Sequence, residues 1–211
     1  MLKIIDNYRD LPIGMYQEIC AIDRRQDLDD LSKQVLTISL LTYTLEEEIL
    51  DLPISEYRAL AAKATFLEQE YTGKILTAKS YQIGHLTLIP IQDYRKITTA
   101  QYIDFQTFAK DPDQNVVEIL STMLIPKGKK YNQGYDIVEV QDAIRDHLSV
   151  ADALSLLAFF FVRYHRLIVD SLTSCKRAAK RIPDPEKRIQ ILKRIKEQEE
   201  ILLRIGDGSR L

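Results

Sequence analysis

SVADALSLLAFFFVRYHRLIVDSLTSCKRAAK, residues 149–180, decides the fold, because the whole stretch reads as one long helix. No Gly or Pro interrupts it, and Ser149 is placed to cap a helix that reaches about Ala179. Its most apolar part, Ala153–Val162, has about ten residues, whereas a bilayer span needs about twenty. Charged side chains follow directly. We therefore expect a buried core helix with a polar continuation, and no membrane span.

Long stretches without Gly or Pro indicate further helices on both sides of this one. Asp27 and Thr98 are expected to cap two of them. Apolar residues at helical spacing predict helices near residues 12–24, 27–42, 45–52, 55–67, 98–108, 113–125, 137–147 and 185–205.

The residue pattern changes only between residues 74 and 91. There, two apolar, β-branched runs flank Gly84 and His85, which predicts two strands joined by a tight turn. The predicted fold class is therefore mainly α, with a helical bundle-like body, one inserted β-hairpin near residues 74–91, and a long C-terminal helical extension.

The net charge of −2 conceals two oppositely charged parts. Residues 163–211 hold 13 Lys and Arg against 7 Asp and Glu, whereas residues 1–162 hold 16 basic and 24 acidic residues. We expect an acidic helical body, residues 1–148, continuous with residues 149–211, which hold the long core helix and a basic terminal helix. A functional hypothesis has to account for this division of charge.

Common catalytic and cofactor motifs are missing from the sequence. The seven glycines form neither GxGxxG nor a P-loop, and no histidine has a second His or Cys three or four residues away. Cys20 and Cys175 stand far apart without a CxxC motif, so we expect a reducing compartment. The charged N-terminus, MLKIIDNYRD, does not resemble a secretion signal. We expect no catalytic residue, no cofactor and no metal.

The basic C-terminal segment is the best-defined candidate for binding. Three interpretations stay open: a solvated helix face, contact with nucleic-acid phosphates, and docking on an acidic protein surface, including the acidic body of a neighbouring copy. The candidate phosphate or acidic-surface contacts are Lys176, Arg177, Lys180, Arg181 and Arg188.

Two further sets of residues are candidates for protein contact. Heptad-like spacing gives the terminal helix an apolar stripe that needs a partner surface, in its own core or on another chain: Ile191, Ile195, Leu202 and Ile205. The loop PKGKKYNQGYD, residues 126–136, combines basic residues with tyrosines, which are frequent in contact surfaces. Its candidate contacts are Lys127, Lys129, Lys130 and Tyr131.

Three segments together resemble a known family. They are DLDDLSKQVLTISLLTYTLEEEILDLPISEYRALAAKATFL (residues 27–67), ITTAQYIDFQTF (97–108) and LSVADALSLLAFFF (148–161). In their helix starts and apolar positions they resemble small helical tail assembly chaperones and related virion proteins of tailed phages that infect Bacteroidetes, including crAss-like phages. The resemblance covers residues 10–162 and leaves out the basic C-terminal helices.

This resemblance implies a non-enzymatic protein that binds other phage structural or tail proteins, in several copies within an assembly. As a virion subunit or packaged cargo it is expected first in the host cytoplasm and then in the virion. As a tail assembly chaperone it is expected to be absent from the mature particle. Binding of DNA by the basic helices is a separate alternative.

Overall fold

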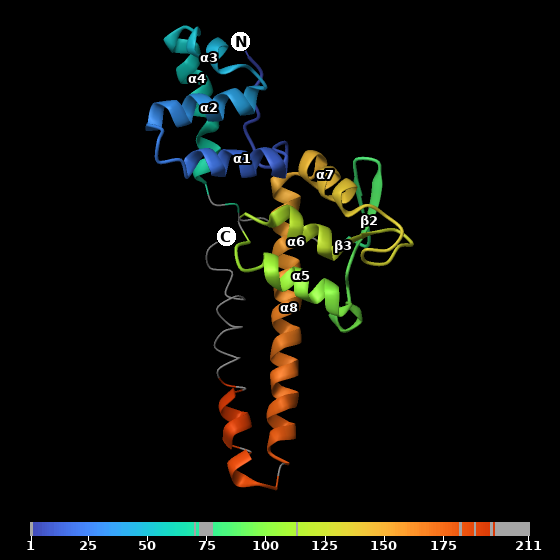
Figure 1. Ribbon diagram of the computed structural model, residues 1–211. Coiled ribbons are helices and arrows are strands. Elements are labelled where there is room, and N and C mark those ends of the chain that lie inside the picture. The colour runs from blue at the N-terminus through green and yellow to red at the C-terminus, as the bar shows by residue number, and fades with distance from the viewer. Residues whose placement is uncertain are drawn as a thin grey trace.

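The computed structural model describes residues 2–69, 71, 78–112, 114–181, 183–187, 189–194 and 196. This part of the chain is mainly α-helical and includes one small antiparallel sheet, as the sequence predicts. Figure 1 shows an N-terminal helical lobe, a middle region that contains the sheet, and one long helix that leaves the body.

Four helices and a short 3-10 turn make up the N-terminal lobe. The predicted cap at Asp27 is wrong: the Asp29 carboxylate instead accepts a 2.7 Å hydrogen bond from the Ser32 amide. Asp27 is held by Arg25, whose Nη2 lies 2.6 Å from its Oδ2, so it is not available for the helix. The elements are α1 (Ile13–Asp23), α2 (Asp30–Thr42), α3 (Glu46–Leu50), α4 (Ile54–Ala64) and η1 (Thr65–Glu68).

The middle region contains the predicted hairpin and a third strand that was not predicted. Gly84 has a φ of +56°, in the left-handed region that tight turns favour. The third strand pairs antiparallel with the second, with Ile89 opposite Ile125. The elements are β1 (Tyr81–Ile83), β2 (Leu86–Pro90), η2 (Tyr94–Lys96), α5 (Thr99–Phe108), α6 (Val116–Met123), β3 (Leu124–Pro126) and α7 (Ile137–His147). Residues 72–77, where the first strand was expected to start, lie outside the described residues.

Helix α8 (Val150–Ala179) is the longest described element, with 30 residues and a length of about 45 Å. Ser149 caps it as predicted, with its Oγ accepting a 3.1 Å hydrogen bond from the Asp152 amide. Its first half passes through the body and its second half extends away from it (Figure 1). The chain then reverses, and helical residues between 185 and 194 run back toward the body. No helix in the described part of the chain is both long enough and apolar enough to cross a membrane.

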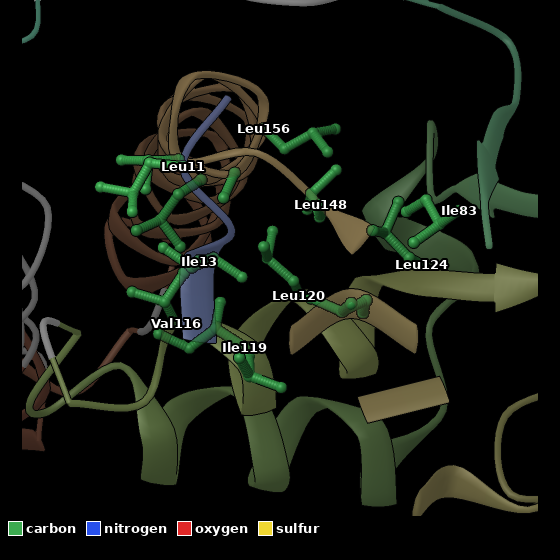
Figure 2. Close-up of a cluster of buried hydrophobic side chains, with 14 of the residues drawn as sticks. Leu11, Ile13, Ile83, Val116, Ile119, Leu120, Leu124, Leu148 and Leu156 are labelled. Carbon is green, nitrogen blue, oxygen red and sulfur yellow. The ribbon is translucent and has the colours of Figure 1, made fainter. Parts of the chain in front are cut away.

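The hydrophobic core surrounds α6, which is buried along almost its whole length. Side chains from α6, the N-terminal segment and the start of α8 meet there, including Leu11, Leu120 and Leu156 (Figure 2). Backbone hydrogen bonds join the N-terminal segment to the start of α8: the Ile13 amide donates to the Leu148 carbonyl at 2.9 Å, and the Val150 amide to the Leu11 carbonyl at 2.8 Å. The buried cluster therefore extends on both sides of the division predicted at residue 148.

Candidate interaction surfaces

The point where α8 leaves the body is fixed by aromatic side chains. The Phe105 ring is fully buried, with its centroid 5.0 Å from that of Tyr164 and 5.9 Å from that of Phe161. Tyr94 donates its hydroxyl to the Phe160 carbonyl at 2.9 Å. Each of these contacts joins α8 to η2 or α5, so the direction in which α8 projects is set by packing rather than by a loop.

Polar contacts support the same joint. Gln106 donates its side-chain amide to the Tyr164 hydroxyl at 2.5 Å. Burial raises the pKa of Tyr164 to about 12, although the hydrogen bond from Gln106 works in the opposite direction. Burial likewise raises the pKa of Tyr94. Both hydroxyls therefore stay neutral over the ordinary pH range.

Beyond Tyr164, most side chains of α8 are exposed. Arg177, Lys180 and Arg181 are exposed, as a binding role requires, and Lys176 is partly buried. Exposed apolar side chains follow on the returning segment. We call this region the basic tip and define it by Lys176, Arg177, Lys180, Arg181, Lys187, Ile189 and Ile191.

The remaining predicted residues of the terminal helix are placed only in part. Ile191 is 38% exposed, whereas the neighbouring Leu192 is partly buried. The side chains of Arg188 and Ile195 lie outside the described part of the structure, as do Leu202 and Ile205. Their predicted contacts stay predictions.

The candidate contacts in the loop of residues 126–136 are of two kinds, exposed lysines and a buried tyrosine. Lys127, Lys129 and Lys130 are exposed, which suits contact with a partner. Tyr131 is only 9% exposed, and its hydroxyl donates to Asp104 Oδ2 at 2.7 Å. Burial, followed by the bond to Asp104, raises its pKa. Tyr131 thus holds the loop against α5 and leaves the three lysines as the surface that a partner can contact.

A second surface, at the far end of the N-terminal lobe, was not recognised in the sequence. Four large apolar side chains around α3 are between 62% and 74% exposed, and four exposed carboxylates lie among them. No Lys or Arg occurs from Gln34 to Tyr57, and that gap was the available signal. Acidic residues also suit the first turn of a helix, where Glu46, Glu47 and Glu48 lie, so their presence does not by itself indicate a surface. We call this surface the acidic cap and define it by Tyr43, Leu45, Glu46, Glu47, Glu48, Leu50, Asp51 and Ile54.

Two cavities border α1. One, of about 560 Å³, lies between α1, α2 and α4 and is lined by Ile19, Asp23 and Lys33 among others. The Lys33 ammonium donates to the Asp23 backbone carbonyl at 2.6 Å, so this charge is used within the fold. The other, of about 530 Å³, is lined in part by Tyr43 and Leu45 and therefore adjoins the acidic cap.

The histidines do not gather into a chemical site. His85 Nε2 lies 2.9 Å from Glu139 Oε1, in an exposed pair that joins the hairpin turn to α7. Over the part of the chain that the structure describes, no group of three or more His, Cys, Asp or Glu side chains is arranged to hold a metal ion.

The geometry thus defines a mainly α protein with a small antiparallel sheet and a projecting helix. Comparison with known proteins finds no matching family model, no similar curated protein and no similar solved structure.

Proposed function

We propose that this chain is a non-enzymatic assembly protein of a tailed phage. It serves as a tail- or connector-associated structural subunit or as packaged cargo, and it works in several copies through helix-mediated contacts with other phage structural or tail proteins. It is made in the host cytoplasm and enters the virion.

The observation that carries this proposal is the projecting half of α8. Its first half has an evident role in the core, because Leu156, Phe160 and Tyr164 are fully buried. The second half contributes little to that core, and Val169 is exposed there. A helix that is held rigidly at its root and exposed at its end is suited to contact with another protein. The resemblance of residues 10–162 to phage assembly proteins supplies the class of partner.

Mass spectrometry of purified particles tests the structural-subunit form of the proposal. The chain is expected in mature virions at a fixed ratio to a known structural protein, after density-gradient purification. A host cytoplasmic protein of similar abundance, measured in the same samples, controls for carry-over. Absence from mature particles, with presence in assembly intermediates, would leave the chaperone alternative.

Nucleic-acid binding is the second candidate function, and the exposed basic side chains favour it. If Lys176, Arg177, Lys180 and Arg181 contact phosphates, DNA affinity falls steeply with salt, with a log–log slope of about 0.9 for each contact. Replacing all four by Gln should then reduce the slope by about three to four. A matched variant with Lys3, Lys63, Lys96 and Lys110 replaced by Gln, four exposed lysines outside the candidate surfaces, should keep the wild-type slope. No DNA binding by the wild type at low salt excludes this function.

A further inference from the structure

We infer that copies of this chain associate head to tail, with the basic tip of one copy docked on the acidic cap of the next. This inference names the partner of the projecting helix and rests on the proposed function only in requiring that this helix binds protein. It does not depend on whether the chain is part of a phage particle.

The acidic cap has the character of a docking surface because its apolar side chains are large, exposed and close together in the sequence. Leu45, Leu50 and Ile54 lie on or next to one short helix, and each is more than half exposed. On that helix only Ile49 is buried in the core. Contiguous exposed apolar surface rimmed by charge marks interaction sites in soluble proteins.

The backbone at Tyr43 supports the same interpretation. Tyr43 ends α2 with a φ of +53° and a ψ of +39°, a left-handed conformation that usually carries glycine in this position. Its amide and that of Thr44 donate to the Leu40 and Ser39 carbonyls, so the helix end needs this geometry. A ring that is 74% exposed adds nothing to the core. Tyrosine is enriched in protein contacts, and such a role accounts for a bulky side chain here.

The charge of the acidic cap indicates which surface docks on it. Four carboxylates lie on the cap without a basic residue near them in the sequence: Glu46, Glu47, Glu48 and Asp51. The basic tip carries Arg177, Lys180 and Arg181 exposed, together with the apolar Ile189 and Ile191. Both surfaces thus carry exposed apolar side chains, and each carries the charge that is opposite to that of the other. Complementary potentials of this kind steer association and fix the orientation of partners.

The positions of the two surfaces make the contact intermolecular. The cap lies at one extreme of the molecule and the end of α8 at the other (Figure 1). With α8 held at its root by Phe105 and Tyr94, the tip of a chain cannot reach its own cap. Where two copies make this contact once, it is heterologous, and repetition generates a ring or an open row of copies. An antiparallel pair that makes the contact twice closes as a dimer.

Charge reversal in the full-length protein tests this arrangement. A cap variant carries Glu47→Lys, Glu48→Lys and Asp51→Lys, which changes the net charge of the cap residues from −4 to +2. A tip variant carries Arg177→Glu, Lys180→Glu and Arg181→Glu, which changes the net charge of the tip residues from +5 to −1. Sedimentation velocity over a concentration series measures self-association at low and high salt. The wild type should associate at low salt. Each variant alone should associate at least about tenfold more weakly than the wild type.

Mixing the two variants gives the decisive measurement. Cap and tip charges are then opposite in every pairing between the variants, so association should return to within about threefold of the wild type. This recovery also shows that both variants are folded. A variant with Lys79→Glu, Lys96→Glu and Lys110→Glu, three exposed lysines of the middle region, has the same change in charge as the tip variant and should associate like the wild type.

Three results would overturn the inference. They are a wild type that stays monomeric at low salt, a tip variant that associates as well as the wild type, and a mixture that fails to recover when circular dichroism shows both variants folded. Because none of these measurements uses phage particles, failure here is separate from failure of the proposed function.

Tyr43→Gly provides an independent measurement. The substitution suits the left-handed backbone, so the melting temperature should not fall. Self-association should weaken on the order of tenfold if the ring is part of the contact. Unchanged association would remove Tyr43 from the interface and contradict the role given to it here.

Discussion

Phe105→Ala should loosen the joint that holds α8 and destabilise the protein by about 4 kcal/mol. Truncation of a buried Phe to Ala costs about 3–5 kcal/mol, and less where the surroundings can collapse into the space. Here the surroundings are rigid, because the ring is fully buried and lies 5.0–6.5 Å, centroid to centroid, from Tyr94, Phe161 and Tyr164. Each aromatic pair adds about 0.5–1.5 kcal/mol beyond burial, which places the loss at about 4 kcal/mol rather than at the lower end of the range.

Urea unfolding, followed by far-ultraviolet circular dichroism, measures this loss, and the chain has no Trp to report it by fluorescence. Phe105→Leu keeps most of the volume and should cost about 1 kcal/mol. Phe108→Ala, on the same helix but only partly buried, should cost less than about 2 kcal/mol. A loss below about 2 kcal/mol for Phe105→Ala, with an unchanged denaturant slope, would refute the view that this ring locks α8 to the body.

Two further predictions concern the body. Gly14→Ala should destabilise the protein by about 1–3 kcal/mol, although a change from Gly to Ala within a helix usually stabilises it. The reason is that the new Cβ would lie 2.3 Å from Arg145 Cγ and 3.0 Å from the Arg145 carbonyl oxygen. Thermal melts should show that the double variant with Arg145→Ala regains part of the stability lost on Gly14→Ala. Stability should also fall as the pH rises from about 10 through 12, because the folded-state pKa of Tyr164 exceeds the usual value and its favourable contribution is complete only below pH 10. Tyr164→Phe should show a shallower decline in melting temperature between pH 10 and 12, and an equal decline would contradict this assignment.

The helical part of the fold could be predicted because its signals are local. Ser149 and Thr98 cap their helices as expected, and α8 ends at Ala179, where the pattern of residues placed it. Strand β3 could not be predicted, since Leu124 and Ile125 continue the apolar run of α6 without a change of period. Only the pairing of these residues with β2, far away in the sequence, makes them a strand.

The candidate surfaces also differ in whether local sequence signals could predict them. Basic residues such as Lys180 and Arg181 were found because a run of like charges is visible in one dimension. The acidic cap was missed because its carboxylates have an adequate local explanation at helix starts. The exposure of Tyr43 and Leu50 depends on how α2, α3 and α4 pack, and spacing alone does not reveal it. For the same reason, Tyr131 reads in the sequence as a surface residue, although the fold buries it against Asp104.

The hydrogen bonds between the N-terminal segment and the start of α8 have a consequence for synthesis of the chain. The Ile13 amide and the Leu11 carbonyl are hydrogen-bonded to Leu148 and Val150, so residues 11–13 leave the ribosome well before the residues that they bind. Until α8 begins to emerge, the backbone of residues 11–13 and its apolar side chains lack their final cover. Pairing over such a sequence separation slows folding, and the body can be completed only after the start of α8 has been synthesised.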